Sequence, residues 1–242
     1  MEGPSLVIAT EDLRQFLKKK VAKASGTANL PLKYLKGQVL LRARSWGKHL
    51  ILDFSRVSMR IHFLMFGSYR IDNPRPNRFP KMELEIGGSK IFFYSCAIKI
   101  LEGNYEKDYD WSTDLMSKKW DAKAALAKIR KKPTAEIADV LMDQAIFSGL
   151  GNIMKNEILF LLLMHPETKI EELTATRQKE VVKVSRQYSF QFYEWKKANI
   201  LKRNWQIMRK KVCPRCNRKV VKKPTGKLKR LSHYCPHCQK KR

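Results

Sequence analysis

Four cysteines near the end of the chain have the spacing of a metal site. Cys213-Pro-Arg-Cys216 and Cys235-Pro-His-Cys238 form two C-x2-C pairs separated by eighteen residues. Each pair lets two thiolates converge from one tight turn, and two facing pairs supply the tetrahedral sulfur set that zinc prefers. His233 and His237 are alternative ligands, but the sulfur set is complete without them, so we expect both to face solvent or phosphate. The spacing predicts a structural zinc ion.

The segment between the cysteine pairs is strongly basic. Residues Lys222 to Arg230 predict a hairpin that turns at Pro224 and Gly226. A four-cysteine site has no open coordination position, so the metal would brace this hairpin rather than catalyse a reaction. A rigid tip that concentrates like charges favours an anionic ligand. A solvated run of charges is the alternative.

The run from Met142 to Ile153 predicts two helices joined by a turn with two glycines. Because Gly149 and Gly151 lack side chains, a phosphate can approach the free backbone N–H groups at the start of the second helix, where the helix dipole favours an anion. Asn152 would either cap that helix or donate to the same phosphate. A simple connecting turn is the alternative.

The overall charge favours a polyanionic partner. The 242 residues carry 50 Lys+Arg against 22 Asp+Glu, a net charge of +28 and a pI of about 10.1. Each phosphate that such a surface neutralises releases counterions and strengthens binding. With 43% hydrophobic residues, the chain is expected to fold rather than to coat a polyanion as a disordered tail. The longest apolar run, Ile158 to Met164, is too short to cross a bilayer, and no apolar signal-peptide core lies near Met1, so we expect an intracellular protein without a membrane partner.

The hydrophobic pattern changes from strand-like to helical along the chain. An amphipathic helix is expected over Glu11 to Lys20. Strand-like runs separated by glycines then predict a mostly antiparallel sandwich or barrel; these runs are Val39–Leu41, His49–Phe54, Met59–Phe63, Met82–Ile86 and Lys90–Tyr94. Helical patterns cover Ala122–Lys131, Thr134–Asp143, Asn152–Met164 and Gln178–Lys202. We therefore expect an α+β protein with an N-terminal sandwich at 1–102, a hinge at 103–121, a helical domain at 122–208 and a cysteine finger at 209–242.

Five motifs in this order resemble one known family. They are Glu2-Gly3-Pro4, Ser45-Trp46-Gly47-Lys48, the run His62 to Gly67, the turn and helix from Asp143 to Glu157, and the four-cysteine finger. Together, over nearly the whole chain, they resemble the formamidopyrimidine-DNA glycosylase and endonuclease VIII family of base-excision repair enzymes. The resemblance implies that a catalytic sandwich and a helix-two-turn-helix domain clamp damaged DNA and flip a base out. The N-terminal amine then attacks the sugar, and the resulting Schiff base permits strand cleavage.

The resemblance also implies roles for single residues. Glu2 looks like the acid that moves protons at the sugar, and Lys48 like the hairpin lysine that contacts phosphate and assists elimination. Asn152 looks like the residue of the helix-two-turn-helix that grips a phosphate, together with the Gly149 and Gly151 turn. Arg230 looks like the finger arginine that holds the phosphates flanking the lesion. Leu64, Met65 and Phe66 fall where the family fills the space left by the flipped base, and three consecutive large apolar residues cannot all face the core of a strand.

The start of the chain departs from the family pattern, which places a proline between the initiating methionine and the glutamate. Here Met1 precedes Glu2 directly, and Ser5 stands where many members have a second glutamate. The α-amine of Met1, a group with a reference pKa of about 7.7 to 8.0, would then form the imine. If Met1 is removed, the amine belongs to Glu2 instead.

The resemblance implies a DNA glycosylase with abasic-site lyase activity. It also implies a preference for oxidised pyrimidines, because residues 202–212 lack the glycine-containing loop of the family members specialised for oxidised guanine. We expect a monomer that binds damaged duplex DNA, or single-stranded or bubble DNA, in the cytoplasmic nucleoid. One alternative is a lesion binder that lacks catalysis because the proline is missing. Another is an RNA-associated or ribosome-associated zinc protein.

Overall fold

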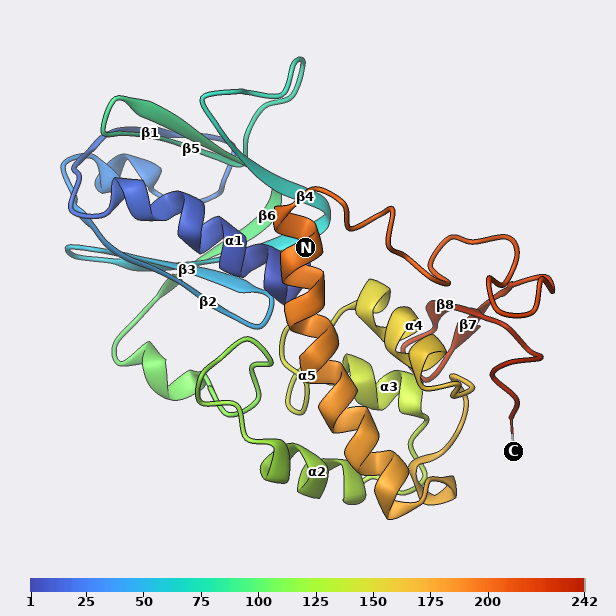
Figure 1. Cartoon of the computed structure of the whole chain (residues 1–242). Helices are drawn as coiled ribbons and strands as arrows, with labels where there is room; N and C mark the ends of the chain where they lie inside the picture. The colour runs from blue at the N-terminus through green and yellow to red at the C-terminus, as the bar shows by residue number, and fades with distance from the viewer. Residues whose placement is uncertain (242) are drawn as a thin grey trace. The chain divides into compact units, whose positions relative to one another are not determined.

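The computed structural model describes residues 1–241 and divides them into two compact units. The first unit contains Met1 and Ser5–Tyr109, and the second contains Glu2–Pro4 and the residues from Asp110 onward. The segment 103–121, which we predicted to be a hinge, therefore contributes to both units. Figure 1 labels the elements of each unit.

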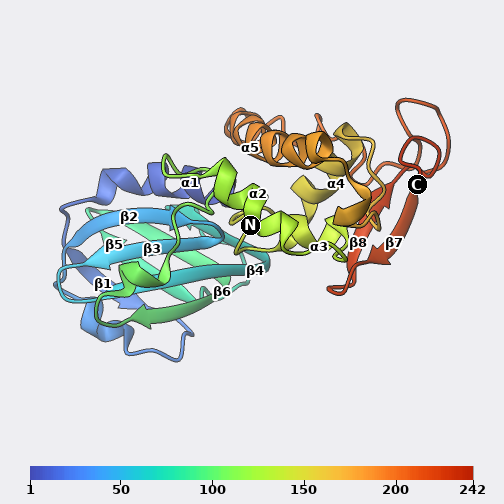
Figure 2. The same ribbon diagram turned by 90° about the horizontal axis from the view of Figure 1, so that it is seen from below.

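The first unit is built on one antiparallel sheet of six strands in the order β1-β5-β6-β4-β3-β2 (Figures 1 and 2). The strands are β1 (Val21–Ser25), β2 (Leu40–Trp46), β3 (His49–Phe54), β4 (Ser58–Ile71), β5 (Met82–Ile86) and β6 (Ser89–Leu101). The two end strands meet at one corner, where Lys20 and Val39 form an antiparallel bridge. The sheet therefore curls into the expected sandwich or half-barrel and encloses its apolar face.

The helix α1 (Gly3–Leu13) lies eight residues earlier than the helix we predicted at Glu11 to Lys20, so that prediction is wrong. Leu6 and Leu13 are fully buried in the core of the first unit, and they lie two turns apart on one face of α1. The chain after Leu13 forms only a short 3-10 turn, Arg14–Phe16, and Lys18 has a positive φ of 64° that ends the helical path. Phe16 and Leu17 thus pack through this turn and not through a continuing helix.

The second unit is helical. Its helices are α2 (Ala122–Arg130), α3 (Ile137–Met142), α4 (Asn152–Leu161) and α5 (Ala175–Lys197). Asp121 caps α2 by accepting N–H bonds from Lys123 and Ala124 at 2.8 and 3.0 Å, as expected for a residue that precedes a helix. The four helices bury one continuous apolar cluster, to which α4 contributes Met154 and Ile158 at helical spacing.

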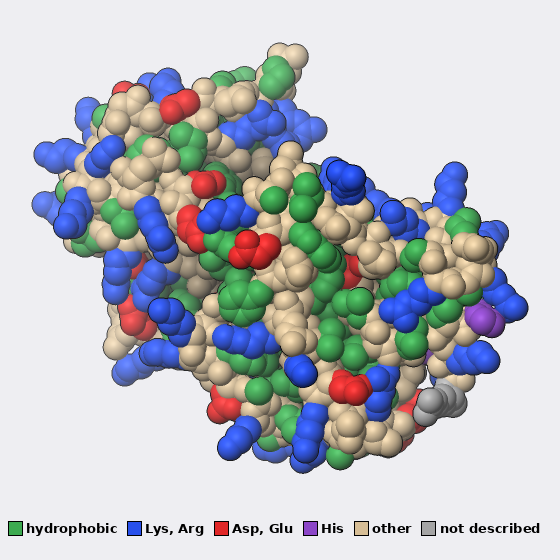
Figure 3. All heavy atoms as spheres, viewed as in Figure 1, with side chains coloured by type: hydrophobic (Ala, Val, Ile, Leu, Met, Phe, Trp, Pro, Cys, Tyr) green, Lys and Arg blue, Asp and Glu red, His purple; other side chains and the backbone are tan. Residues whose placement is uncertain are grey.

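A two-stranded hairpin completes the second unit. Its strands are β7 (Val221–Thr225) and β8 (Arg230–Tyr234), and β8 lies beside α4 (Figure 2). A small core that includes Phe160, Ile207 and Val220 joins the helices to the cysteine segment. Lys and Arg side chains are spread over the visible surface of both units (Figure 3). Within residues 1–241, no helix has the length and apolarity needed to cross a membrane.

Candidate functional site

The four cysteines converge as the sequence predicts. The Sγ atoms of Cys213, Cys216, Cys235 and Cys238 all lie within 4.8 Å of one another. A tetrahedral ion bound at about 2.3 Å by each sulfur would place the sulfurs about 3.8 Å apart. The Sγ atoms of Cys213 and Cys238 are 3.9 Å apart, and those of Cys216 and Cys235 are 3.4 Å apart. The donor set and its size therefore fit a closed four-sulfur metal site.

Two carboxylates at the start of α3, those of the N-cap residue Glu136 and of Asp139, hold the turn of the β7–β8 hairpin. The backbone N–H of Gly226 donates to Glu136 at 3.0 Å, and the N–H of Lys227 donates to Asp139 at 2.7 Å. Gly226 has a φ of 72°, and a Cβ at this position would come within 3 Å of the Asp139 carboxyl group. The turn therefore requires glycine on both conformational and steric grounds. Arg230 follows this turn as the exposed first residue of β8.

The start of α4 binds a carboxylate of the chain itself. The carboxylate of Glu2 accepts N–H bonds from Ile153 at 2.7 Å and from Met154 at 3.2 Å. The N–H of Gly3 donates to the carbonyl of Gly149 at 2.8 Å, so the Glu2–Pro4 segment is pinned against the two-glycine turn. We predicted that backbone N–H groups at this helix start would face a phosphate. That prediction is corrected for these two groups, because an internal anion already satisfies the positive end of the helix.

The glycine at position 151 makes room for that carboxylate. Its φ of −118° is open to any residue, so Gly151 is not needed for backbone conformation. A Cβ there would instead come within 3 Å of the Glu2 side chain. Gly149 differs, because its φ of 95° lies in the region that favours glycine.

Asn152 is the first residue of α4, and its side chain joins the helix to the hairpin. The N-cap position belongs to Gly151, which excludes the first of the two alternatives for Asn152, that it caps the helix. The Asn152 amide donates from Nδ2 to the carbonyl of Leu231 at 3.0 Å, while its Oδ1 has no hydrogen-bond partner among residues 1–241. Leu231 directly follows Arg230, so Asn152 lies next to the start of β8.

Lys155 is a buried cation that the sequence analysis missed. Its side chain is fully buried, and its Nζ donates to the Ser232 hydroxyl at 2.8 Å. Burial lowers the pKa of Lys155 to about 8, an effect opposed by Asp139 and Glu2 and reinforced by Arg230. Lys155 lies four residues, or one helical turn, after Gly151. This spacing from the two-glycine turn was the sequence signal that could have identified Lys155 as part of the site.

Two further polar residues of α4 anchor the finger segment. Asn156 donates to the carbonyl of Asn152 at 2.9 Å and accepts the N–H of His233 at 3.0 Å. Glu157 is fully buried and accepts three backbone N–H bonds from residues 206–208, at 2.8 to 3.0 Å. Burial raises the pKa of Glu157, and these three donors oppose the rise. Through these contacts α4 holds residues 206–208, which lead into the cysteine segment, and it also holds strand β8.

His233 is not at the surface, contrary to our prediction. It is only 4% exposed, and its Nδ1 accepts the N–H of Arg209 at 3.1 Å. Burial lowers its pKa, so the ring is neutral at physiological pH. His237 is exposed, as expected.

In the first unit, Lys48 lies in the tight turn between β2 and β3. The Lys48 carbonyl lies 3.2 Å from Nδ1 of His62. The pKa of His62 is lowered first by burial, and the charges of Lys48 and of the N-terminal amine lower it further. The ring of His49 lies 5.4 Å from that of His62, and burial lowers the pKa of His49 to about 4. The side chain of Met1 packs against the core of this unit. The Lys48 turn therefore lies beside His62, and the charges of Lys48 and of the N-terminal amine both act on this ring.

Leu64, Met65 and Phe66 protrude from β4. They interrupt the pairing of β4 with β6, which is regular up to Phe63 and resumes at Ser68. Their exposed fractions are 50%, 73% and 77%, as expected for a run that does not belong to the core. Phe66 has a positive φ of 65°, which turns this bulge outward.

Comparison with known proteins places both units in one group. Residues 6–96 match the family model described as the formamidopyrimidine-DNA glycosylase N-terminal domain, and residues 112–188 match the formamidopyrimidine-DNA glycosylase H2TH domain. Endonuclease 8-like 3 of Mus musculus is 32% identical over 90% of this chain and 37% of its own length. The formamidopyrimidine-DNA glycosylase of Actinobacillus succinogenes is 28% identical over 80% of this chain and 79% of its own length.

The fold has close counterparts among solved structures. The Lactococcus lactis formamidopyrimidine-DNA glycosylase, non-covalently bound to DNA containing an AP site, has a TM-score of 0.86 and 21% identity over the full length of both chains. The chain spans 33–38% of the length of the endonuclease 8-like 3 proteins that it matches.

Proposed function

Because the chain belongs to the formamidopyrimidine-DNA glycosylase and endonuclease VIII family, we propose that it is a base-excision-repair glycosylase that removes oxidised bases and cleaves the abasic site. The observation that carries this proposal is that the Lys48 turn contacts His62, whose pKa the charges of Lys48 and of the terminal amine both lower. A reactive amine beside a second cation is what imine chemistry at a phosphate-flanked sugar requires. The net charge of +28 supports DNA as the partner.

The proposed reaction begins at the N-terminal amine. The neutral amine attacks C1′ of the sugar, a nitrogen–carbon bond forms, and the bond to the damaged base breaks as the base leaves with a proton. Glu2 follows Met1 directly in the chain, and its carboxylate accepts the N–H bonds of Ile153 and Met154. In the proposed reaction this carboxylate also accepts and returns protons at the sugar. The sugar ring then opens: the C1′–O4′ bond breaks and O4′ takes up a proton, which converts the adduct to an imine. Loss of a C2′ proton from the imine then expels the 3′ phosphate. Lys48 stabilises the negative charge of that phosphate.

The second unit would hold the DNA backbone. Asn152 and Arg230 lie at the junction of α4 and β8. The buried, positively charged Lys155 of α4 donates to Ser232 of β8 at the same junction. Backbone phosphates attract such a cluster because each contact releases counterions. In the proposed complex Asn152 and Arg230 bind phosphates beside the lesion, with Gly149 and Gly151 shaping the turn.

Zinc is the metal that we propose for the cysteine site. Four thiolates at this spacing leave no open position for a reacting group, so the ion would supply only structural cross-linking of the finger. It would brace the hairpin that presents Arg230.

The exposed apolar bulge of Leu64, Met65 and Phe66 would fill the gap that the extruded base leaves in the DNA stack. When a base leaves the stack, the hole must be refilled, and large apolar side chains do this at low cost. Leu64, Met65 and Phe66 are exposed and adjacent, which suits this role. We further propose oxidised pyrimidines as the preferred lesion, because residues 202–212 contain no glycine-rich loop to close over a purine. The protein would act as a monomer, on duplex, single-stranded or bubble DNA, in the nucleoid.

Borohydride trapping tests this proposal directly. A duplex with an abasic site or an oxidised pyrimidine, incubated with the protein and borohydride, is expected to give a covalent protein–DNA adduct. Lys48→Ala should reduce cleavage far more than DNA affinity, whereas Lys36→Ala, a change at an exposed lysine of the same unit, should alter neither. Failure to form the adduct, with folding and DNA binding intact, would refute the catalytic proposal.

A second candidate function is a lesion binder without catalysis. It is favoured by the direct Met1–Glu2 junction, which lacks the proline of the family pattern. Insertion of proline before Glu2 separates the two. A large gain of cleavage without a gain of affinity would show that the parent protein binds lesions but lacks the nucleophile.

A further inference from the structure

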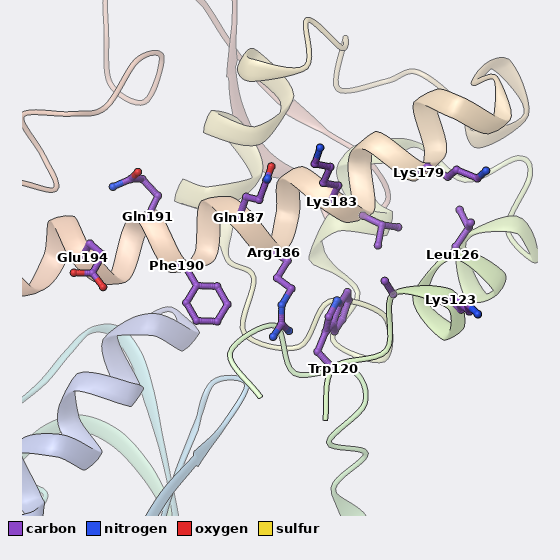
Figure 4. Close-up of a pocket in the computed structure, with 12 residues that line it drawn as sticks. Trp120, Lys123, Leu126, Lys179, Lys183, Arg186, Gln187, Phe190, Gln191 and Glu194 are labelled. Atoms are coloured by element: carbon purple, nitrogen blue, oxygen red, sulfur yellow. The ribbon is translucent and has the colours of Figure 1, made fainter. Parts of the chain in front are cut away.

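A groove runs between α2 and α5 in the second unit, on a surface that the proposed DNA chemistry does not use. Its volume is about 820 Å³. The residues that α5 contributes to it recur every three or four positions from Lys179 to Glu194, so they form one face of this helix. Figure 4 shows Leu126 and Lys123 of α2 opposite this face.

The floor of the groove is apolar. Trp120, Leu126, Val182 and Phe190 line it, and the Phe190 side chain is 41% exposed. Figure 4 shows Arg186 between Phe190 and Trp120. The guanidinium carbon of Arg186 lies 5.2 Å from the centre of the Phe190 ring. A large exposed aromatic beside aliphatic side chains is typical of a binding surface.

Arg186 is fixed in place by the loop that precedes α2. Its guanidinium donates to the carbonyl of Leu115 at 3.1 Å and to that of Ser117 at 3.2 Å. This anchoring holds the charge of Arg186 on the groove wall and stiffens the apolar floor beside it. The groove is therefore preformed, which reduces the entropy lost when a ligand binds.

The rim of the groove is basic. Lys123, Lys179 and Lys183 are exposed, and within residues 1–241 none of them forms an ion pair closer than 4 Å. Glu194, at one end, is the only acidic residue among those that line the groove. Apolar contacts in the centre and positive charges at the edge match a ligand with the opposite arrangement.

We propose that this groove docks an acidic amphipathic helix of a partner protein. The residues from Lys179 to Glu194 span about 22 Å at 1.5 Å per residue, the length of about four helical turns. An apolar stripe on the partner would cover Phe190 and Leu126, and flanking Asp or Glu side chains would meet Lys123, Lys179 and Lys183. The phosphates of a nucleic acid would meet only the basic residues, whereas the apolar stripe of a helix also covers Leu126 and Val182 in the aliphatic part of the floor.

A labelled peptide binding assay tests the proposal on the full chain. The probe is a fluorescein-labelled helical peptide of eighteen residues, with Leu at i, i+3, i+4, i+7 and i+11 and with Asp and Glu beside this stripe. A scrambled peptide of the same composition is the control ligand. Fluorescence polarisation is expected to rise saturably with the ordered peptide and to show at least about tenfold weaker binding of the scrambled one, since only the helix presents one apolar face.

Two variants locate the binding. The double substitution Lys179→Glu and Lys183→Glu should weaken peptide binding at least about tenfold. Lys196→Glu, at an exposed lysine in the last turn of α5 outside the groove, should leave it within about twofold. Phe190→Ser should also weaken binding, with thermal unfolding as the control for folding. The proposal would be overturned if both peptides bound equally or if neither bound at millimolar concentration. It would also be overturned by equal effects of the two charge changes, or by full displacement of the peptide by a single-stranded oligonucleotide.

Discussion

Replacing Gly151 by alanine should expel the Glu2 carboxylate from the start of α4. The new methyl group would occupy space within 3 Å of the Glu2 side chain, while the φ of −118° accommodates alanine without strain. The carboxylate would then lose the N–H donors of Ile153 and Met154. Hydrogen bonds to charged groups contribute about 1.5 to 3 kcal/mol each, and only one of these two is short, so we expect a loss of about 2 to 4 kcal/mol. For a unit of this size, the corresponding fall in Tm is about 10 °C.

Tryptophan fluorescence suits this measurement, because four of the five tryptophans belong to the second unit. A double-mutant cycle with Glu2→Ala isolates the contact, since this substitution removes the side chain with which the new methyl group collides. In the Glu2→Ala background, Gly151→Ala should cost less than about 1 kcal/mol, the ordinary penalty of alanine at an N-cap. If Gly151→Ala destabilises both backgrounds equally, the glycine does not serve the carboxylate and the reasoning is refuted.

Three further perturbations address the remaining features. The pKa of Lys155 falls to about 8 on folding, so between about pH 8 and 10.5 the unfolded chain binds a proton that the folded chain does not. The free energy of unfolding should therefore rise by up to about 3 kcal/mol over this pH range. Urea titration should find this rise in the parent protein and not in Lys155→Met. Cys235→Ser should release the metal, which mass spectrometry of bound zinc would detect, and should weaken DNA binding at least about tenfold. The β-sheet signal in circular dichroism should persist. Unchanged DNA affinity would show that the finger does not belong to the DNA interface. Phe66→Ala, at a side chain 77% exposed, should leave Tm within about 1 °C yet reduce adduct formation on duplex DNA about tenfold, and equal adduct yields would argue against a wedge role.

Local sequence patterns were informative where the structure depends on neighbours in the chain. The strands His49–Phe54 and Met82–Ile86 have the same bounds as predicted. The first is an apolar run next to a turn, and the second alternates apolar and polar residues, and both patterns specify strands. Strand β1 (Val21–Ser25) was missed, since only Val21 is fully buried and its short run carries little alternation. The helix near the N-terminus was misplaced because Leu13 and Phe16 suggested a period that the chain abandons at Lys18.

The site shows the same division. The cysteine cluster was predictable because metal coordination requires two close pairs at set spacing. The bond from Glu2 to the start of α4 was not, since no local pattern links residue 2 to residue 153. His233 was misjudged for the same reason, because its partner Asn156 lies on a helix far away in sequence. Long-range polar pairing is therefore what the pattern of residues alone left open.

The anchoring of the hairpin turn by Glu136 and Asp139 affects how quickly and selectively the basic tip can engage a polyanion. A loop that must first become ordered binds slowly and loses affinity to that ordering, whereas this turn is already held at its backbone amides. The acids that hold it also offset part of its positive charge, which weakens attraction at long range and leaves close contact to decide binding. We therefore expect the turn to favour phosphates at one fixed position over anions that a flexible loop would accept at many positions.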